Sequence, residues 1–175
     1  MRSKAYGLLY LLLSVAAVLI VLMVLNWLPT MLQKDMMRRF NSLDEVQSKL
    51  NIRELQVPSY FPQSIMWPPS EILAQAKPYP AVLMIFNDVN TRAITLVISQ
   101  GTTDAFSANT LIPFVRVTRK VPLDLKTRKA ILEVGTCKDD EPCSRLSWTE
   151  NNFRTVITMK SEPFELIRIA ESMIP

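Results

Sequence analysis

The sequence predicts an α+β domain, a curved antiparallel sheet in the form of a half-barrel with a packed C-terminal helix, behind a single transmembrane helix. Three observations predict it. No charged residue lies between Lys4 and Lys34. Apolar runs separated by turn residues recur about every eight to twelve positions from Ala81 onward, and an amphipathic segment closes the chain. We therefore expect an anchor with a juxtamembrane extension over residues 1–40 and the α+β domain over residues 41–175.

The uncharged N-terminal stretch, residues 5–33, is long enough to cross a bilayer. About 20 apolar residues with a rise of about 1.5 Å each cover the roughly 30 Å hydrocarbon core. A helix of that length in a soluble core would show a polar face, and none is visible in this stretch. Its apolar part is longer than the about 7–15 residues of a cleaved signal peptide, which predicts a retained signal anchor.

Some residues of this predicted helix suit contact with another membrane helix. Gly7, Ser14 and Ala17 are small and let a second helix approach closely. Asn26 lies near the outer end, where its amide can hydrogen-bond to a neighbour. We therefore expect these four residues to bind partner subunits within the bilayer.

Two local patterns follow the span. Residues 31–40 place apolar side chains four positions apart, which predicts that the helix continues outward as an amphipathic interfacial turn. Ser42 and Glu45 then form a capping box, which predicts a short helix that runs to about Leu50. Asn51 is expected to end this helix because asparagine tolerates the left-handed conformation.

A proline-rich segment comes next and carries three aromatic residues. Prolines at positions 58, 62, 68, 69, 78 and 80 argue against a long helix and against any central strand. The segment is therefore expected to be extended and to wrap one edge of the domain. Tyr60, Phe61 and Trp67 have two alternative roles, a platform for a protein partner or packing over the sheet edge.

Strand signals begin at Ala81 and continue to the last helix. Apolar runs at 81–87 and 93–100 flank turn residues and predict a hairpin. Further strands are expected at 114–121 and 130–136, and a last hairpin pairs 146–148 with 153–159. We expect an antiparallel meander.

The C-terminal helix is predicted by its cap and its stripe. Ser161 or Glu162 precedes Pro163, which suits a first helical turn. The apolar stripe has helical spacing and should lie on the inner face of the sheet: Leu166, Ile169, Ala170 and Met173. Trp148 is expected in the core that faces this helix.

The only two cysteines, Cys137 and Cys143, bound a short polar turn. Two thiols alone make a poor zinc site, so we expect a disulfide that closes this loop. Disulfides need an oxidising compartment, which places the domain outside the cytoplasm and the N-terminus inside. Two free thiols in a cytosolic loop are the alternative. The acidic residues within the loop, Asp139, Asp140 and Glu141, lack the spacing of a calcium site and predict a solvated turn.

Composition excludes most catalytic chemistry. The chain has no histidine, which removes Ser-His and Cys-His nucleophiles and His-ligated metals. No paired general acid and base stands out, so we expect no enzyme and no cofactor. The net charge of +4 is modest, and we expect no nucleic-acid partner. The densest basic run, residues 116–129, could meet anionic lipid or an acidic partner, with a solvated hairpin as the alternative.

Four segments, residues 42–47, 57–62, 146–152 and 165–172, resemble a bacterial family of uncharacterised extracytoplasmic domains. These domains occur in membrane-anchored anti-sigma-like proteins and in lipoproteins, and they look related to the half-barrel of lipoprotein carriers. The resemblance implies a single-pass protein of the bacterial inner membrane with a periplasmic C-terminal domain. Its motifs are structural and imply no catalytic residue.

Two functions follow as hypotheses. The first is an accessory subunit that contacts the lipid bilayer and other integral membrane subunits and stabilises their complex. The second is a carrier or envelope sensor that binds a lipid or a lipoprotein in the half-barrel. An open apolar cavity would favour the carrier, whereas a filled core with an exposed aromatic patch would favour the subunit, for which no small-molecule ligand is expected.

Overall fold

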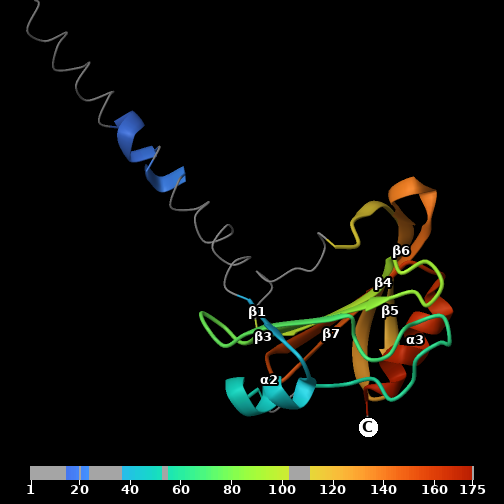
Figure 1. Cartoon of the computed structure of the whole chain (residues 1–175). Helices are drawn as coiled ribbons and strands as arrows, with labels where there is room; N and C mark the ends of the chain where they lie inside the picture. The colour runs from blue at the N-terminus through green and yellow to red at the C-terminus, as the bar shows by residue number, and fades with distance from the viewer. Residues whose placement is uncertain (1–14, 20, 24–36, 53–54, 103–110, 175) are drawn as a thin grey trace, which may run out of the picture. The chain divides into compact units, whose positions relative to one another are not determined.

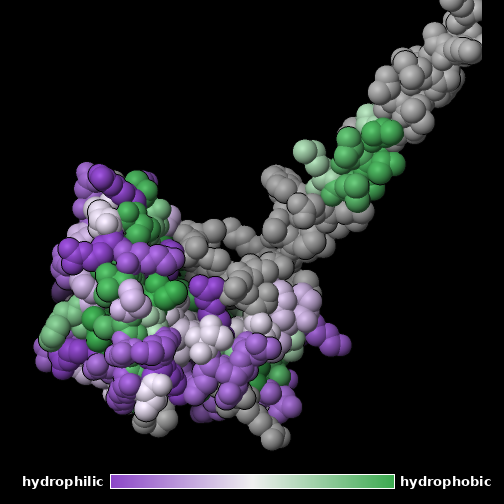
Figure 2. All heavy atoms as spheres, turned by 180° about the vertical axis from the view of Figure 1, so that it is seen from behind, coloured by the Kyte–Doolittle hydropathy of each residue, from purple (hydrophilic) through white to green (hydrophobic). Residues whose placement is uncertain are grey.

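The computed structural model describes residues 15–19, 21–23, 37–52, 55–102 and 111–174 (Figure 1). The chain forms two units, Met1–Met37 and Arg38–Pro175. In the first unit, the described residues before position 37 are helical, exposed and hydrophobic (Figure 2). No helix within the described residues has the length and hydropathy needed to cross a membrane. The predicted span lies largely outside those residues.

The second unit is built on one antiparallel sheet of eight strands with the order β1-β2-β3-β4-β8-β7-β6-β5. The chain therefore makes two meanders, β1 to β4 and β5 to β8, which join where β4 pairs with β8. The predicted antiparallel meander is thus present as two parts, which the β4–β8 pairing joins. The strands are β1 (Arg38–Phe40), β2 (Glu71–Gln75), β3 (Ala81–Asn87), β4 (Ile94–Gly101), β5 (Phe114–Leu125), β6 (Arg128–Cys137), β7 (Pro142–Glu150) and β8 (Phe153–Met159).

Strand β1 corrects the predicted juxtamembrane extension. Residues 38–40 pair with β2 and do not continue a helix, so they belong with the unit that begins at Arg38. The strand buries Phe40 opposite Ile72, which an interfacial helix could not do. An ion pair of 2.5 Å joins Arg39 on β1 to Glu71 on β2.

Strand β2 corrects the expectation that the proline-rich segment holds no central strand. It pairs with β1 on one side and with β3 on the other. The prolines lie outside it, at Pro69 and Pro78, so residues 71–75 keep every backbone donor. Ile72 and Ala74 are buried, which shows that five residues between prolines suffice to add a strand to this core.

The two predicted hairpins are confirmed, and each turn follows from local chemistry. In the β3–β4 turn the Asp88 carboxylate accepts hydrogen bonds from the backbone N–H groups of Asn90 and Thr91, at 2.9 and 2.8 Å. In the β7–β8 turn Asn151 and Asn152 have φ values of 47° and 66°. Two consecutive residues with positive φ match the twist of antiparallel strands, and asparagine adopts this conformation at low cost.

Helix α2 (Leu43–Leu50) has the predicted caps. The Ser42 hydroxyl accepts from the backbone N–H of Glu45 at 3.2 Å, and Asn51 ends the helix with φ 53°. The Glu45 carboxylate accepts from the backbone N–H of Asn41, one residue before the expected partner. It also pairs with Lys49 at 2.7 Å.

We expect Glu45→Gln to make stability less dependent on pH below neutrality. The hydrogen bond from Lys49, and then that from Asn41, hold the pKa of Glu45 below its usual value. The stability that the Glu45 carboxylate contributes is therefore fully present above the unfolded-state pKa of about 4.3. This stability is lost as the pH falls through the lower folded-state pKa. Urea unfolding of the full chain in mild detergent should show a larger difference between wild type and variant at about pH 6 than at about pH 3. An equal difference at both pH values would contradict the assignment.

Helix α3 (Pro163–Ser172) packs on the sheet against β5, β7 and β8, as expected for an α+β fold. Glu162 precedes it without a capping side-chain bond, and Pro163 occupies the first turn. The predicted stripe is buried: Leu166, Ile169 and Ala170 have no exposed surface, and Met173 has 5%. Trp148 on β7 is 3% exposed, within the same core.

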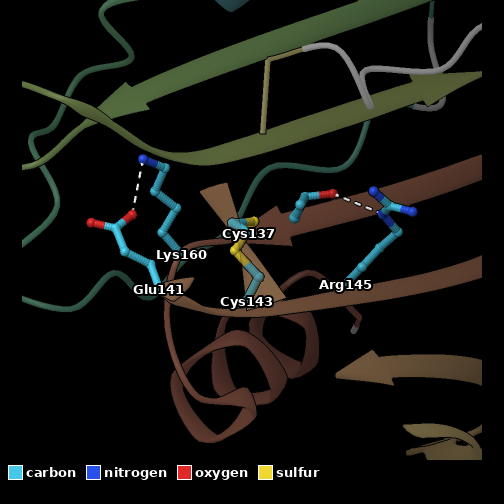
Figure 3. Close-up of a disulfide and its surroundings, with 6 residues drawn as sticks. Cys137, Glu141, Cys143, Arg145 and Lys160 are labelled. Carbon is cyan, nitrogen blue, oxygen red and sulfur yellow. Dashed lines mark hydrogen bonds and ion pairs between the residues drawn. A yellow bond between two sulfur atoms is a disulfide. The ribbon is translucent and has the colours of Figure 1, made fainter. Parts of the chain in front are cut away.

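The predicted disulfide between Cys137 and Cys143 is present, with a Cα–Cα distance of 5.6 Å (Figure 3). It joins the end of β6 to the start of β7 across a short 3₁₀ turn, Lys138–Asp140. Within this loop the Cys137 N–H donates to the Glu141 carbonyl, and the Glu141 carboxylate pairs with Lys160 at 3.1 Å.

Replacement of both cysteines with serine should lower the free energy of unfolding by about 2 kcal/mol, because the short closed loop restricts the unfolded chain. Urea unfolding of the full chain with and without the double substitution measures this. Peptide mass spectrometry without reduction should find a two-hydrogen loss across the loop. Native protein in which both thiols react with an alkylating agent would contradict the disulfide and the compartment inferred from it.

Candidate functional site

The candidate site is the segment of residues 58–69, which is fixed to the domain at both of its ends. At one end, the Ser59 hydroxyl donates to the carbonyl of Ser172 and the Tyr60 N–H donates to the Ser172 hydroxyl, both at 3.2 Å. At the other end, the Met66 N–H donates to the Asn87 carbonyl at 2.8 Å. The segment therefore bridges the C-terminal end of α3 and the end of β3, and its prolines restrict the backbone between these two attachments.

Three aromatic rings form a cluster on this segment. Phe61 lies 4.9 Å from Trp67 and 5.1 Å from Phe86, measured between ring centroids, and Trp67 lies 6.2 Å from Phe86. Phe86 comes from β3 and is fully buried, whereas Trp67 is 53% exposed. The stack thus leads from the core to the surface, and its outer member presents an aromatic face to solvent from a fixed position.

Tyr60 belongs to a different cluster, on helix α3. Its hydroxyl donates to Glu165 at 2.8 Å, and the Arg168 guanidinium lies 4.2 Å from the centre of its ring. The hydrogen bond to Glu165 raises the pKa of Tyr60. Arg168 also lies 5.8 Å from the ring of Phe164, which is 68% exposed. Tyr60 therefore attaches the segment to α3, and Phe164 is the exposed aromatic residue of this second cluster.

The structure brings together two of the three predicted aromatic residues and adds two that the sequence reasoning missed. Phe61 and Trp67 share one stack, while Tyr60 points to α3. Phe86 was missed because it sits within the apolar run of a buried strand. The exposure of Phe164 could have been predicted from the sequence, because Phe164 falls outside the helical spacing of the buried stripe and so faces solvent.

The residues predicted to meet another membrane helix lie mostly beyond the described part of the chain. This holds for Gly7, Ser14 and Asn26. Ala17 lies in the described helical residues 15–19 and is exposed.

Polar side chains around the disulfide are engaged with one another (Figure 3). Arg145 donates from Nε to the Thr158 hydroxyl at 3.3 Å and pairs with Glu133 at 3.4 Å. Its guanidinium also lies 4.4 Å from the centre of the Phe114 ring, and burial lowers the pKa of Arg145. In the part of the chain that the structure describes, no group of three His, Cys, Asp or Glu residues could hold a metal ion.

The space between α3 and the sheet is occupied by side chains. Leu166 and Ile169 from the helix belong to one buried cluster with Ile98, Leu146 and Ile157 from three strands, and none of the five has exposed surface.

Comparison with family models, with curated proteins and with solved structures finds no match for this chain. The resemblance to periplasmic bacterial domains stays a prediction.

Proposed function

We propose that this chain is a non-enzymatic, single-pass accessory subunit of a bacterial inner-membrane complex. Its periplasmic domain binds and stabilises the complex. The observation that carries the proposal is Trp67, half exposed on a stack that continues to the buried Phe86. Rigid aromatic side chains bind protein partners at low entropic cost and are enriched at interface centres.

Two further features support a protein-binding domain over a carrier. Leu166 and Ile169 of helix α3 are buried in the core. Side chains therefore occupy the space that a bound acyl chain would need. Phe164 adds a second exposed aromatic ring, on the helix to which Tyr60 attaches the proline-rich segment. We also propose that the sheet curves into a half-barrel and that α3 lies on its inner face.

Anchorage and compartment are supported by separate observations. The uncharged residues 5–33 have the length of a membrane span, and the described residues among them are helical. The disulfide between Cys137 and Cys143 suits an oxidising compartment.

Site-specific photocrosslinking in native membranes tests the partner surface. A photoreactive residue at position 67 should give one discrete adduct, whereas the same residue at Ser48, exposed on α2, should not. Trp67→Ala should reduce the native mass of the extracted complex without unfolding the domain. Val89→Ala, which removes an exposed apolar side chain outside the stack, should leave that mass unchanged.

A native mass of a single chain in mild detergent, unaffected by either substitution, would overturn the subunit proposal. Saturable binding of a fatty acid or lipopeptide by such a monomer would favour the carrier instead.

A further inference from the structure

The hairpin of β5 and β6, residues 114–137, carries the net charge of the whole protein. It has six basic residues and two acidic ones, a net charge of +4. The full chain has twenty basic and sixteen acidic residues, also +4, so the rest of the chain is neutral in sum. Such a concentration of positive charge attracts an anionic surface.

The same hairpin exposes apolar side chains. The described part of the second unit has seven large hydrophobic residues that are exposed, and four of them lie here: Val115, Val117, Val121 and Ile131. Val115 is the most exposed, at 70%. Interfacial helices combine basic and apolar side chains in this way, so that one segment contacts both headgroups and acyl chains.

Part of the positive charge has no acidic partner within the described residues. Lys120 pairs with Glu133 at 3.0 Å, and Lys129 pairs with Asp124 at 2.5 Å. Arg128 pairs with Glu150 on β7. Arg116 and Arg119, by contrast, are exposed, and neither forms an ion pair in the described part of the chain. Among the described residues, nothing therefore competes with an external anion for these two exposed guanidinium groups.

The backbone of β5 does not suit addition of a further strand. β5 is the last strand of the sheet order, so no strand of the described residues pairs with its outer edge. Its pairing with β6 is shifted by bulges between Phe114 and Arg116 and between Val117 and Arg119, and Pro122 removes one backbone donor. Bulges, proline and basic residues are the features that block pairing at a sheet edge. An extended protein segment is thus a poor occupant, whereas a lipid surface needs no backbone register.

We propose that the β5–β6 hairpin binds the surface of an anionic phospholipid bilayer. Arg116 and Arg119 contact lipid phosphates, Lys120 adds positive charge beside them, and Val115 and Val117 enter the boundary between headgroups and acyl chains. Long basic side chains can reach phosphates while shorter apolar neighbours lie deeper. The proposal rests on the membrane anchorage proposed above, which keeps the domain near lipid, and it assigns a second, separate contact to the domain.

Lipid quenching in proteoliposomes tests the contact on the full chain. The described residues have no free cysteine, so Val115→Cys provides one site for a fluorophore. Vesicles contain brominated phosphatidylcholine, alone or with about 30% phosphatidylglycerol, which supplies the negative surface. We expect quenching at position 115 to be severalfold stronger in the anionic vesicles and to be lost at about 0.5 M salt, where charges are screened. A fluorophore at Gln47→Cys, exposed on α2, should show no such difference.

Matched variants separate the hairpin from net charge. Arg116→Gln/Arg119→Gln/Lys120→Gln should abolish the lipid-dependent quenching. Lys49→Gln/Lys77→Gln/Lys138→Gln, which removes three exposed charges elsewhere, should preserve it. Near-ultraviolet circular dichroism confirms that each variant is folded.

Equal quenching in both vesicle types, or quenching that the hairpin variant retains, would overturn the proposal. So would a label that responds to soluble polyglutamate and not to anionic lipid, because that result identifies an acidic protein partner. Extraction of the vesicles with alkaline carbonate tests the membrane anchorage separately. Release of the chain by carbonate would contradict the transmembrane span. Quenching that occurs only with anionic lipid would still support the hairpin contact in that case.

Discussion

Trp148→Ala should lower the free energy of unfolding by about 3–5 kcal/mol, the range for removal of a large buried aromatic side chain. Trp148 lies on β7 opposite Ala130 on β6 and Thr155 on β8. Its exposed fraction is 3%, and it shares the core cluster with Leu166 and Ile169 of α3. In the variant, alanine would occupy both paired positions, 130 on β6 and 148 on β7. A cavity would remain under α3, because Ala130 is too small to fill it.

Urea unfolding of the full chain in mild detergent measures this loss. Trp67→Ala is the matched control, since it removes the same side chain from a half-exposed position and should cost much less. A loss below about 1 kcal/mol for Trp148→Ala would mean that the core collapses around the missing ring.

Gly135→Ala should cost about 3 kcal/mol, at the upper end of the range for forced packing. Gly135 lies on β6 between the two bulges of β5, where the strands approach closely. An added Cβ would clash with the Arg116 carbonyl oxygen, and it would lie 2.9 Å from the Arg116 carbonyl carbon and 3.0 Å from the Val117 Cα. These are backbone atoms, which cannot rotate away as a side chain can.

Gly101→Ala provides the comparison for Gly135. Its added Cβ would lie 3.2 Å from the Pro80 carbonyl oxygen, a tight contact that a small shift relieves. We expect a smaller loss at this position in the same urea experiment. Equal losses at both glycines would show that the cost comes from backbone freedom and not from the close approach of β5 and β6.

Features set by neighbouring residues could be predicted from the sequence. The Ser42 cap of α2, the asparagine pair of the β7–β8 turn and the buried stripe of α3 each depend on a few adjacent side chains. Strands β1 and β2 could not be predicted in this way. Each is short, and each is a strand because a distant partner covers it, as Phe40 and Ile72 show.

The candidate site shows the same division. The proline-rich backbone indicated that Phe61 and Trp67 are fixed aromatic residues, and the structure places their rings in contact, with centroids 4.9 Å apart. Their third ring, Phe86, comes from a strand whose apolar run indicates burial and gives no sign of which side chains it meets. The separation of Tyr60 from its neighbour Phe61 depends on Glu165 and Arg168, over a hundred positions away in the chain.

The pairing of β4 with β8 also sets the order in which the fold can be completed. Gly101 pairs with Arg154 and Leu96 with Met159, so the partner of β4 lies near the end of the chain. Leu96, Val97 and Ile98 are buried on both faces of the sheet. At about 5–20 residues per second, the ribosome synthesises β8 several seconds after it has synthesised β4. During that time the first meander has an open hydrophobic edge. A nascent chain of this protein is therefore most prone to aggregate just before its last strand emerges.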